Sequence, residues 1–188
     1  MQNSQLDSLC EKLLLIAEER FGPRLVDWIF IGIEINDRPP FIKYYHESGQ
    51  LAISLSQRVI GNDYELIGQL SHEICHLLHP SIEYPSLTKN PTLVINEGLS
   101  TYFSISAMTK FLNAEDLAIN SFKVNSPNYY AAYLAVKELL DIEESSIKRI
   151  RYLCPRIDKV TPEHFRKANI SCSDFLIGRL LTEFSKFA

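Results

Sequence analysis

Residues 63–78 read DYELIGQLSHEICHLL, and the rest of the chain is organised around this stretch. At about 3.6 residues per turn, His72 and His76 lie one turn apart on the same face of a helix. A turn at 61–63 supplies an N-cap, and His79-Pro80 ends the pattern. Apolar residues recur at three- and four-residue steps, as in an amphipathic helix: Leu66, Ile67, Leu70, Ile74, Leu77 and Leu78. The stretch therefore predicts a helix over 63–78 that presents two imidazoles side by side.

Two imidazoles in this arrangement can bind one tetrahedral zinc ion, and a glutamate beside the first can reach a water on the metal. That glutamate is Glu73, so residues 72–76 have the H-E-x-x-H pattern of zinc-dependent hydrolysis. Two of the five histidines of the chain occupy the two required positions. The alternative is a structural helix with two surface histidines and a chance match. A catalytic zinc ion also needs a third protein ligand.

Glu97 is the predicted third ligand. It lies in a second helix predicted over 92–111, with Pro91 at the first-turn position that proline tolerates. Glu97 follows His76 by 21 positions, and a loop of that length can bring the second helix back against the first. Glu83 and His79 compete less well, because Glu83 follows a proline-terminated helix and His79 fits a helix C-terminus that favours a cation. A metzincin would need glycine at position 79 and histidine at position 82, where this chain has histidine and isoleucine.

The residues around Glu97 read Asn96-Glu97-Gly98, followed by Tyr102 and Phe103. H-E-x-x-H followed by N-E-G-x-x-x-Y/F on the next helix resembles the gluzincin group of metallopeptidases, which includes thermolysin-like enzymes and related aminopeptidases. The resemblance implies a zincin-like fold with one zinc ion per chain, held by His72, His76 and Glu97. It also implies that Glu73 is the general base. The gap between the two motifs is slightly longer here than in the best-known members.

Tyr129 is the candidate donor to the oxyanion of a tetrahedral intermediate. The segment Tyr129-x-x-Ala132-Tyr133-x-x-Val136 resembles the Y-x-x-G-Y-x-F-V segment of small gluzincin-type peptidases, in which the first tyrosine donates its hydroxyl. Ala132 stands where that family often has glycine. Tyr130 is the alternative donor, and tyrosines at a helix start also commonly serve in packing.

The remaining patterns predict one α+β domain over 1–188, with a helix-plus-sheet subregion (1–60) and a helical subregion that carries the metal site (61–188). Short connections favour antiparallel neighbours, so we expect a small, largely antiparallel sheet. The cleft should lie between sheet and helices. Peptidases that resemble this chain pair a sheet edge with the substrate backbone, so the strand at 51–55 either borders the cleft in this way or is an ordinary core strand, and the sequence leaves both open. The expected helices are 4–21, 113–122, 129–140, 143–153, 161–168 and 173–185, and the expected strands are 25–35, 41–45 and 51–55.

Composition is ordinary for a globular protein, with 46% hydrophobic and 22% charged residues. The net charge of −4 gives no sign of a nucleic-acid or anionic-membrane partner. No window is apolar enough for a transmembrane helix, and the polar start, Met1 to Leu9, is unlike a signal peptide. The four cysteines form no C-x-x-C pair, which favours reduced thiols in a cytoplasmic protein. Of these, Cys75 is expected in the core.

These patterns favour zinc-dependent hydrolysis of a peptide bond in a peptide or protein substrate. Three alternatives stay open: a catalytically silent, zinc-containing module that binds a peptide or protein, a cytosolic metalloprotease specific for one regulatory protein, and a structural helical protein with a chance motif. The chain lacks the G-x-M-E-N segment with which related aminopeptidases hold the N-terminus of a substrate. This weakens the interpretation as an aminopeptidase but does not establish an endopeptidase. Cleavage specificity and oligomeric state stay open.

Overall fold

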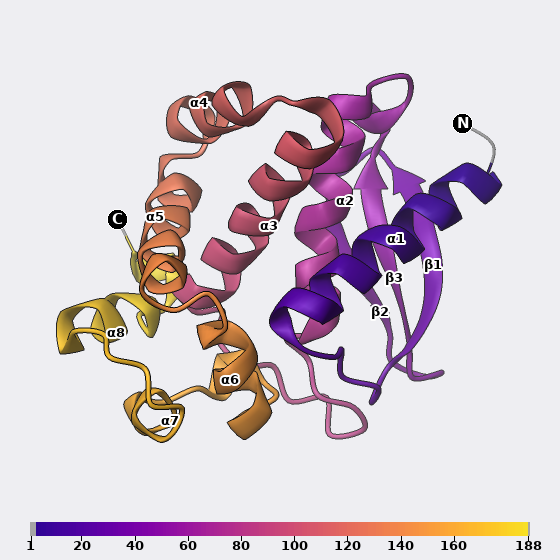
Figure 1. Ribbon diagram of the computed structural model, residues 1–188. Coiled ribbons are helices and arrows are strands. Elements are labelled where there is room, and N and C mark those ends of the chain that lie inside the picture. Colours follow the sequence, from indigo (N-terminus) through magenta and orange to yellow (C-terminus); the bar gives the residue numbers. More distant parts are fainter. Residues whose placement is uncertain (1–2, 188) are drawn as a thin grey trace.

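The chain begins with one helix, continues through three strands, and is helical for the rest of its length (Figure 1). The computed structural model describes residues 3–187 and has the predicted α+β fold. No helix within these residues has the length and apolar character needed to cross a membrane. The elements are α1 (Asn3–Phe21), β1 (Ile29–Asn36), β2 (Phe41–Tyr45), β3 (Gln50–Ser56), α2 (Asp63–Leu78), α3 (Val94–Leu112), α4 (Glu115–Asn125), α5 (Pro127–Ile142), α6 (Ser146–Leu153), α7 (Pro162–Lys167) and α8 (Asp174–Leu180), with single 3₁₀ turns η1 (Gln57–Val59), η2 (Ile157–Lys159) and η3 (Phe184–Lys186).

The sheet is mixed, with the strand order β1-β3-β2. β2 and β3 pair antiparallel, as their short connection predicts, with Ile42 opposite Ile53. β1 lies on the other side of β3 and runs parallel to it, so the expected antiparallel pairing is wrong for this strand. The reason is that β3 inserts between β1 and β2. Two successive chain reversals give β1 and β3 the same direction.

β1 starts at Ile29 and not at Leu25 as the apolar run suggests. The backbone N–H of Leu25 bonds to the carbonyl of Leu78 at 3.0 Å, which ties this segment to the end of α2 and away from the sheet. The central strand β3 places Leu51, Ile53 and Leu55 in the core, where all three are fully buried. β3 contacts α2, so the sheet forms one wall behind the predicted motif helix.

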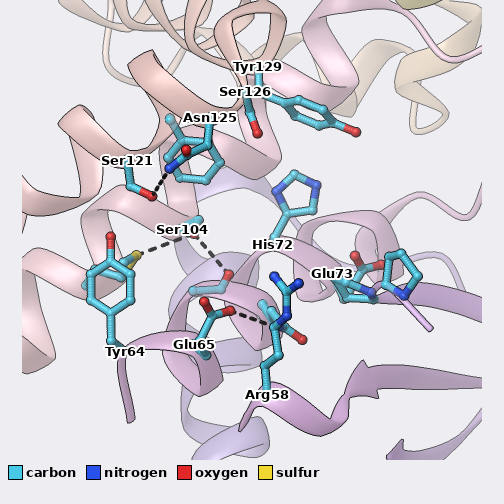
Figure 2. Close-up of a pocket in the computed structure, with 16 residues that line it drawn as sticks. Arg58, Tyr64, Glu65, His72, Glu73, Ser104, Ser121, Asn125, Ser126 and Tyr129 are labelled. Carbon is cyan, nitrogen blue, oxygen red and sulfur yellow. Dashed lines mark hydrogen bonds between the residues drawn. The ribbon is translucent and has the colours of Figure 1, made fainter. Parts of the chain in front are cut away.

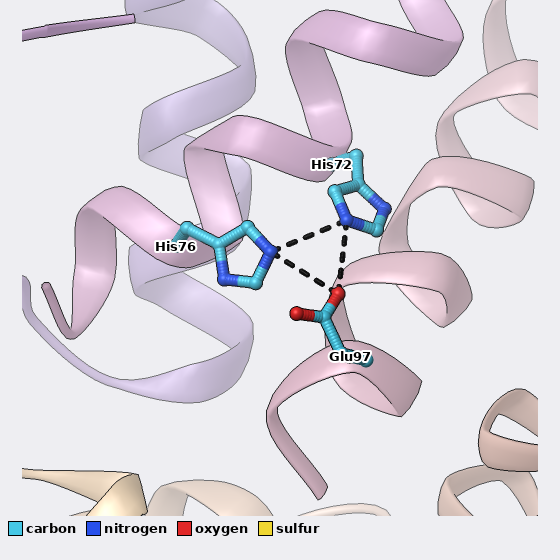
Figure 3. Close-up of side chains that lie close together, drawn as sticks. All are labelled: His72, His76 and Glu97. Atoms are coloured by element: carbon cyan, nitrogen blue, oxygen red, sulfur yellow. Dashed lines mark hydrogen bonds and ion pairs between the residues drawn. The ribbon is translucent and has the colours of Figure 1, made fainter. Parts of the chain in front are cut away.

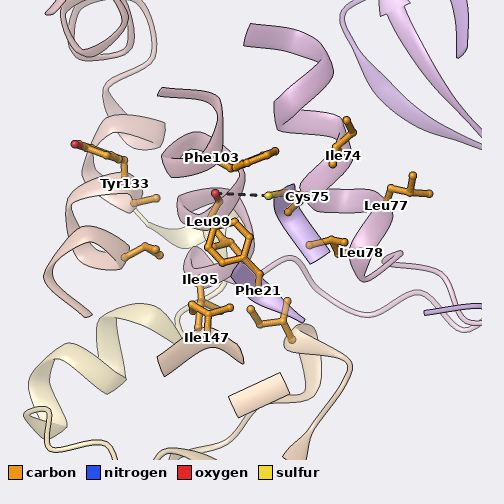
Figure 4. Close-up of a cluster of buried hydrophobic side chains, with 14 of the residues drawn as sticks. Phe21, Ile74, Cys75, Leu77, Leu78, Ile95, Leu99, Phe103, Tyr133 and Ile147 are labelled. Atoms are coloured by element: carbon orange, nitrogen blue, oxygen red, sulfur yellow. Dashed lines mark hydrogen bonds between the residues drawn. The ribbon is translucent and has the colours of Figure 1, made fainter. Parts of the chain in front are cut away.

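α2 and α3 pack side by side (Figure 1), and buried hydrophobic side chains from both gather between them (Figure 4). α2 has the predicted bounds, and the Asn62 side chain accepts a hydrogen bond from the Glu65 N–H at 3.2 Å as its N-cap. Cys75 is a fully buried core residue, as predicted, with Sγ 3.8 Å from the carbonyl oxygen of Leu99. The buried residues that join the two helices include Ile74, Leu78, Ile95, Leu99 and Phe103. This packing holds the two predicted ligand helices against each other.

Several predicted helix boundaries differ from the structure by two or three residues or more, and two of them differ for one shared reason. α3 begins at Val94, two residues later than expected, and Pro91 lies outside it. α8 ends at Leu180, although the pattern suggests a helix to residue 185. The stretch 92–94 pairs with 182–184 through backbone bonds, Val94 N–H to the Thr182 carbonyl at 2.9 Å among them. An extended pairing between segments so far apart in sequence ends both helices early.

Candidate metal centre

His72 and His76 of α2 and Glu97 of α3 bring their ligand atoms together, as Figure 3 shows. The two histidine Nε2 atoms are 3.2 Å apart. Glu97 Oε2 lies 3.3 Å from Nε2 of His72 and 3.4 Å from Nε2 of His76. The side chains are 14%, 22% and 12% exposed, in the order His72, His76, Glu97. The predicted ligand set is therefore assembled in one largely buried place and could hold a metal ion.

The size of this triangle fits zinc. Zinc bonds to histidine nitrogen and carboxylate oxygen are about 2.0–2.1 Å long, so tetrahedral ligands lie about 3.3–3.4 Å apart. The three measured separations match these edges closely. Glu97 Oε2 is buried and has no hydrogen-bond partner among residues 3–187, so its lone pairs are left for a cation. Two nitrogens and one carboxylate oxygen also form a donor set common in catalytic zinc sites.

The charges at the site perturb one another. Burial by itself raises the pKa of Glu97, but the charges of His76 and His72 outweigh it and hold that pKa well below its usual range. Burial lowers the pKa of His76, whereas Glu97 and Glu73 favour its charged form and raise the pKa to about 9. Glu73 is 4% exposed, and burial raises its pKa with a smaller contribution from Glu97. The carboxylates and imidazoles therefore form one coupled cluster.

Gly98 allows α5 to reach this cluster. A Cβ atom at Gly98 would lie 2.4 Å from the carbonyl oxygen of Ala132, closer than real Cβ contacts come. The missing side chain lets α3 and α5 approach, and Tyr129 lies at the start of α5. Its ring centroid is 5.8 Å from that of His72, and Phe184 packs against Tyr129 at 4.8 Å. The close approach of α5 thus explains why the residue after Glu97 is glycine.

Of the two candidate tyrosines, the structure brings Tyr129 to the metal centre. Tyr129 lines the cavity beside His72 and Glu73, and burial raises the pKa of its hydroxyl to about 12 with help from Glu97. Tyr129 therefore keeps its proton at neutral pH and can donate a hydrogen bond. Tyr130 instead stacks on Tyr133 with ring centroids 5.9 Å apart.

Two cavities of about 380 Å³ each lie beside the metal centre and share Pro40, His72, Glu73 and Tyr129 as walls. Figure 2 shows the first of them. One, which we call the Met108 lobe, is lined by Tyr64, Gly68, Met108 and Phe122. The other, which we call the His79 lobe, is lined by Ile42, Tyr44, His79, Thr92 and Asn96. The two lobes meet at these shared residues, and together we call them the cleft.

The strand that borders this cleft is β2 and not the strand at 51–55. Of the two possibilities open for residues 51–55, the core strand is confirmed, because β3 lies at the centre of the sheet, with both of its edges paired. β2 is an edge strand, and its residues Phe41, Ile42 and Tyr44 line the His79 lobe. An edge strand thus borders the cleft.

The competing third ligands are engaged elsewhere. The Glu83 carboxylate pairs with Lys159 and accepts a hydrogen bond from Asn90 Nδ2 at 2.8 Å. His79 is 2% exposed at the end of α2, with Nδ1 3.4 Å from Asn96 Nδ2. Burial, together with the charges of Arg151 and His76, lowers the pKa of His79 well below its usual value. His79 is therefore neutral, and its expected role as a cation at a helix C-terminus is wrong.

Asn96 was not identified from the sequence as a site residue. Its Oδ1 accepts a hydrogen bond from the Leu93 N–H at 3.0 Å, which caps the first turn of α3 just before Glu97. The N-cap residue of α3 is Leu93, whose side chain is not one that caps helices. The cap is made instead by the side chain of Asn96, three residues later, and the sequence does not indicate it.

Comparison of the chain with protein-family models, with curated proteins and with solved structures found no match. The case for function is therefore carried by the two motifs and by the geometry of the residues they contain.

Proposed function

We propose that this protein is a zinc-dependent hydrolase that cleaves peptide bonds with a gluzincin-like catalytic centre. The observation that carries the proposal is the triangle of ligand atoms from His72, His76 and Glu97, whose edges of 3.2–3.4 Å suit tetrahedral zinc. Glu73 and Tyr129 line the same cleft, as a proton acceptor and a hydrogen-bond donor must. A cytoplasmic location is part of the proposal, because all four cysteines are free thiols.

His72, His76 and Glu97 would hold zinc. When bound, zinc supplies Lewis acidity and lowers the pKa of a water toward neutrality. Glu73 takes a proton from the attacking water and passes it to the leaving amine. The Tyr129 hydroxyl donates a hydrogen bond to the carbonyl oxygen as negative charge develops on it. Burial of Glu73 excludes competing water from the carboxylate, so the proton moves between Glu73 and the reacting atoms.

The shape of the cleft supports an extended polypeptide as the substrate. β2 is an edge strand that borders the His79 lobe, and main-chain hydrogen bonds to such a strand are a recurring way to bind peptides. The Met108 lobe meets the His79 lobe at their shared walls. A substrate aligned along β2 would thus have room for residues on both sides of the scissile bond.

The first test is zinc stoichiometry on the purified protein. We expect one zinc ion per chain, lost in His76→Ala and in Glu97→Gln. Glu83→Gln is the matched control, because this carboxylate lies on the connection between α2 and α3 but is paired with Lys159. Absence of zinc from the wild type after incubation at neutral pH would contradict the proposal.

The second test is cleavage of a fluorogenic peptide library by the zinc-loaded protein. We expect Glu73→Gln to abolish cleavage while it keeps the zinc ion, because Glu73 is not a ligand. Zinc binding without cleavage of any peptide would instead favour the silent binding module or a protease for one protein partner.

A further inference from the structure

His79 and Asn96 form a buried polar link between the two ligand helices. His79 is the C-cap of α2, three residues after His76, and Asn96 lies in the first turn of α3, next to Glu97. The two residues are 2% and 4% exposed. Asn96 Nδ2 lies 3.4 Å from His79 Nδ1, within hydrogen-bond distance. The link therefore joins the C-terminal end of α2, near His76, to the N-terminal end of α3, near Glu97.

The direction of this hydrogen bond follows from its neighbour. Asn96 Oδ1 already accepts from the Leu93 N–H at 3.0 Å, which leaves the amide nitrogen facing His79. Asn96 Nδ2 is a donor, so His79 Nδ1 accepts and the ring proton is on Nε2. The result is a chain of two bonds from the Leu93 backbone through Asn96 to His79. The two bonds tie His79 to the first turn of α3 through Nδ1, whereas His79 Nε2 is buried and has no hydrogen-bond partner among residues 3–187.

Other polar links between α2 and α3 lie elsewhere along the helices. Ser104 Oγ donates to the Gly68 carbonyl at 2.9 Å, one turn before His72 and almost two turns after Glu97. Cys75 Sγ reaches the Leu99 carbonyl only at 3.8 Å. Apart from the contacts of the ligands themselves and the long bond of Cys75, the side-chain hydrogen bond that crosses between the helices near His76 and Glu97 within residues 3–187 is that of His79 with Asn96.

We propose that His79 and Asn96 are a positioning pair, which holds α2 and α3 at the separation that lets His76 and Glu97 reach one metal ion. The inference rests on the proposed metal site, and neither residue contributes a ligand atom. Residues that orient metal ligands without touching the metal typically change its affinity about 10–100-fold when mutated. Without the bond between His79 and Asn96, the end of α2 and the start of α3 would be held less tightly, by the loop at 79–93 and by packing. The distances between the ligand atoms would then increase.

The test measures zinc affinity by competition with a chromophoric chelator. We expect His79→Phe, which keeps an aromatic ring but removes the acceptor, to weaken zinc binding about tenfold or more. His79→Gln should recover part of the affinity, because its amide oxygen can accept from Asn96. Ser104→Ala is the matched control: it removes one buried hydrogen bond between the same two helices. It should lower the melting temperature without changing zinc affinity.

A spectroscopic measurement separates positioning from general loss of stability. The visible absorption of the cobalt(II)-substituted protein depends on the geometry of the ligands, so we expect its bands to change in His79→Phe and not in Ser104→Ala. Wild-type zinc affinity and an unchanged cobalt spectrum in His79→Phe would overturn the positioning role and leave the metal site intact. Failure of the wild type to bind zinc would instead overturn the proposed function itself.

Discussion

Two groups of buried charged and polar atoms lie near the C-terminal end of α2: the metal centre, and Arg151 with the carbonyls around it. The hydrogen bonds of Arg151 are all made within the protein, whereas Glu97 Oε2 at the metal centre has no hydrogen-bond partner among residues 3–187. Arg151 is 4% exposed and donates to five backbone carbonyls. A guanidinium has five N–H donors, so none is left over. The acceptors are the carbonyls of Phe21 (2.9 Å), Gly22 (2.7 Å), Pro23 (2.6 Å), Leu78 (3.0 Å) and Pro155 (3.4 Å).

The comparison shows how a structural charge differs from a ligand set. Arg151 compensates the carbonyls at the ends of α1 and α2, where helix dipoles favour a cation, and it requires nothing from outside. At the metal centre, two imidazole nitrogens and a carboxylate oxygen face one another, and Glu97 Oε2 has no hydrogen-bond partner among residues 3–187. The first cluster is complete within the protein, whereas the second could hold a cation. Each prediction below perturbs one side of this comparison.

The largest expected effect comes from Arg151→Met. The change removes the charged donor from five backbone carbonyls, of which that of Leu78 still accepts from the Leu25 N–H. We expect the free energy of unfolding to fall by about 3–5 kcal/mol, because buried hydrogen bonds to a charged group are lost. Urea denaturation measures the loss. Arg166→Met, at an exposed pair with Glu163, should cost less than about 0.5 kcal/mol. A loss below about 1 kcal/mol for Arg151→Met would mean that the cluster is not the structural element we describe.

Zinc should stabilise the other cluster by mass action. At a free zinc concentration about 100-fold above the dissociation constant, the free energy of unfolding should rise by about 2.7 kcal/mol, and a chelator should reverse the gain. Denaturation with and without zinc measures it. Glu97→Gln should show no gain, because it lacks one ligand. Equal stabilisation of wild type and Glu97→Gln would place the bound zinc elsewhere.

Gly98→Ala tests how α5 is brought to the metal centre. The added Cβ meets the Ala132 carbonyl, so α3 and α5 must separate, and we expect a loss of about 1–3 kcal/mol in the free energy of unfolding. Gly178→Ala in α8 is the matched control, because a Cβ there meets nothing within 4 Å. It should stabilise the protein by up to about 1 kcal/mol through helix propensity. Similar effects of both substitutions would contradict a close approach at Gly98.

The smallest expected effect is a pH dependence specific to the metal centre. The pKa of His76 is raised to about 9 by its carboxylate neighbours against the opposing effect of burial. Its contribution to the stability of metal-free protein is therefore fully present below the unfolded pKa of about 6.5 and is lost as the pH rises through about 9. Melting temperatures of chelator-treated protein across this range measure the decline. We expect the decline to be absent from His76→Ala, and its persistence there would assign it to another group.

The local parts of this protein could be predicted from its sequence. The bounds of α2 and β2 match the prediction. The pair His72 and His76 follows from helix periodicity, and Glu97 follows from the Asn-Glu-Gly context. The bounds and the histidine pair depend on residues a few positions apart, whose relative placement is set within one helix or strand. Glu97 was indicated by the resemblance to gluzincins, and it meets the histidines only because α2 and α3 pack together.

Tertiary structure alone decided the rest. The insertion of β3 between β1 and β2, the choice of Tyr129 over Tyr130 and the link from Asn96 to His79 all depend on how distant segments meet. Arg151 is the clearest case, since its carbonyl partners at Phe21 and Leu78 are 130 and 73 positions away. A single arginine in a charged helix carries no periodic signal for such partners. Its role arises only when the ends of α1 and α2 are packed around it and water is excluded.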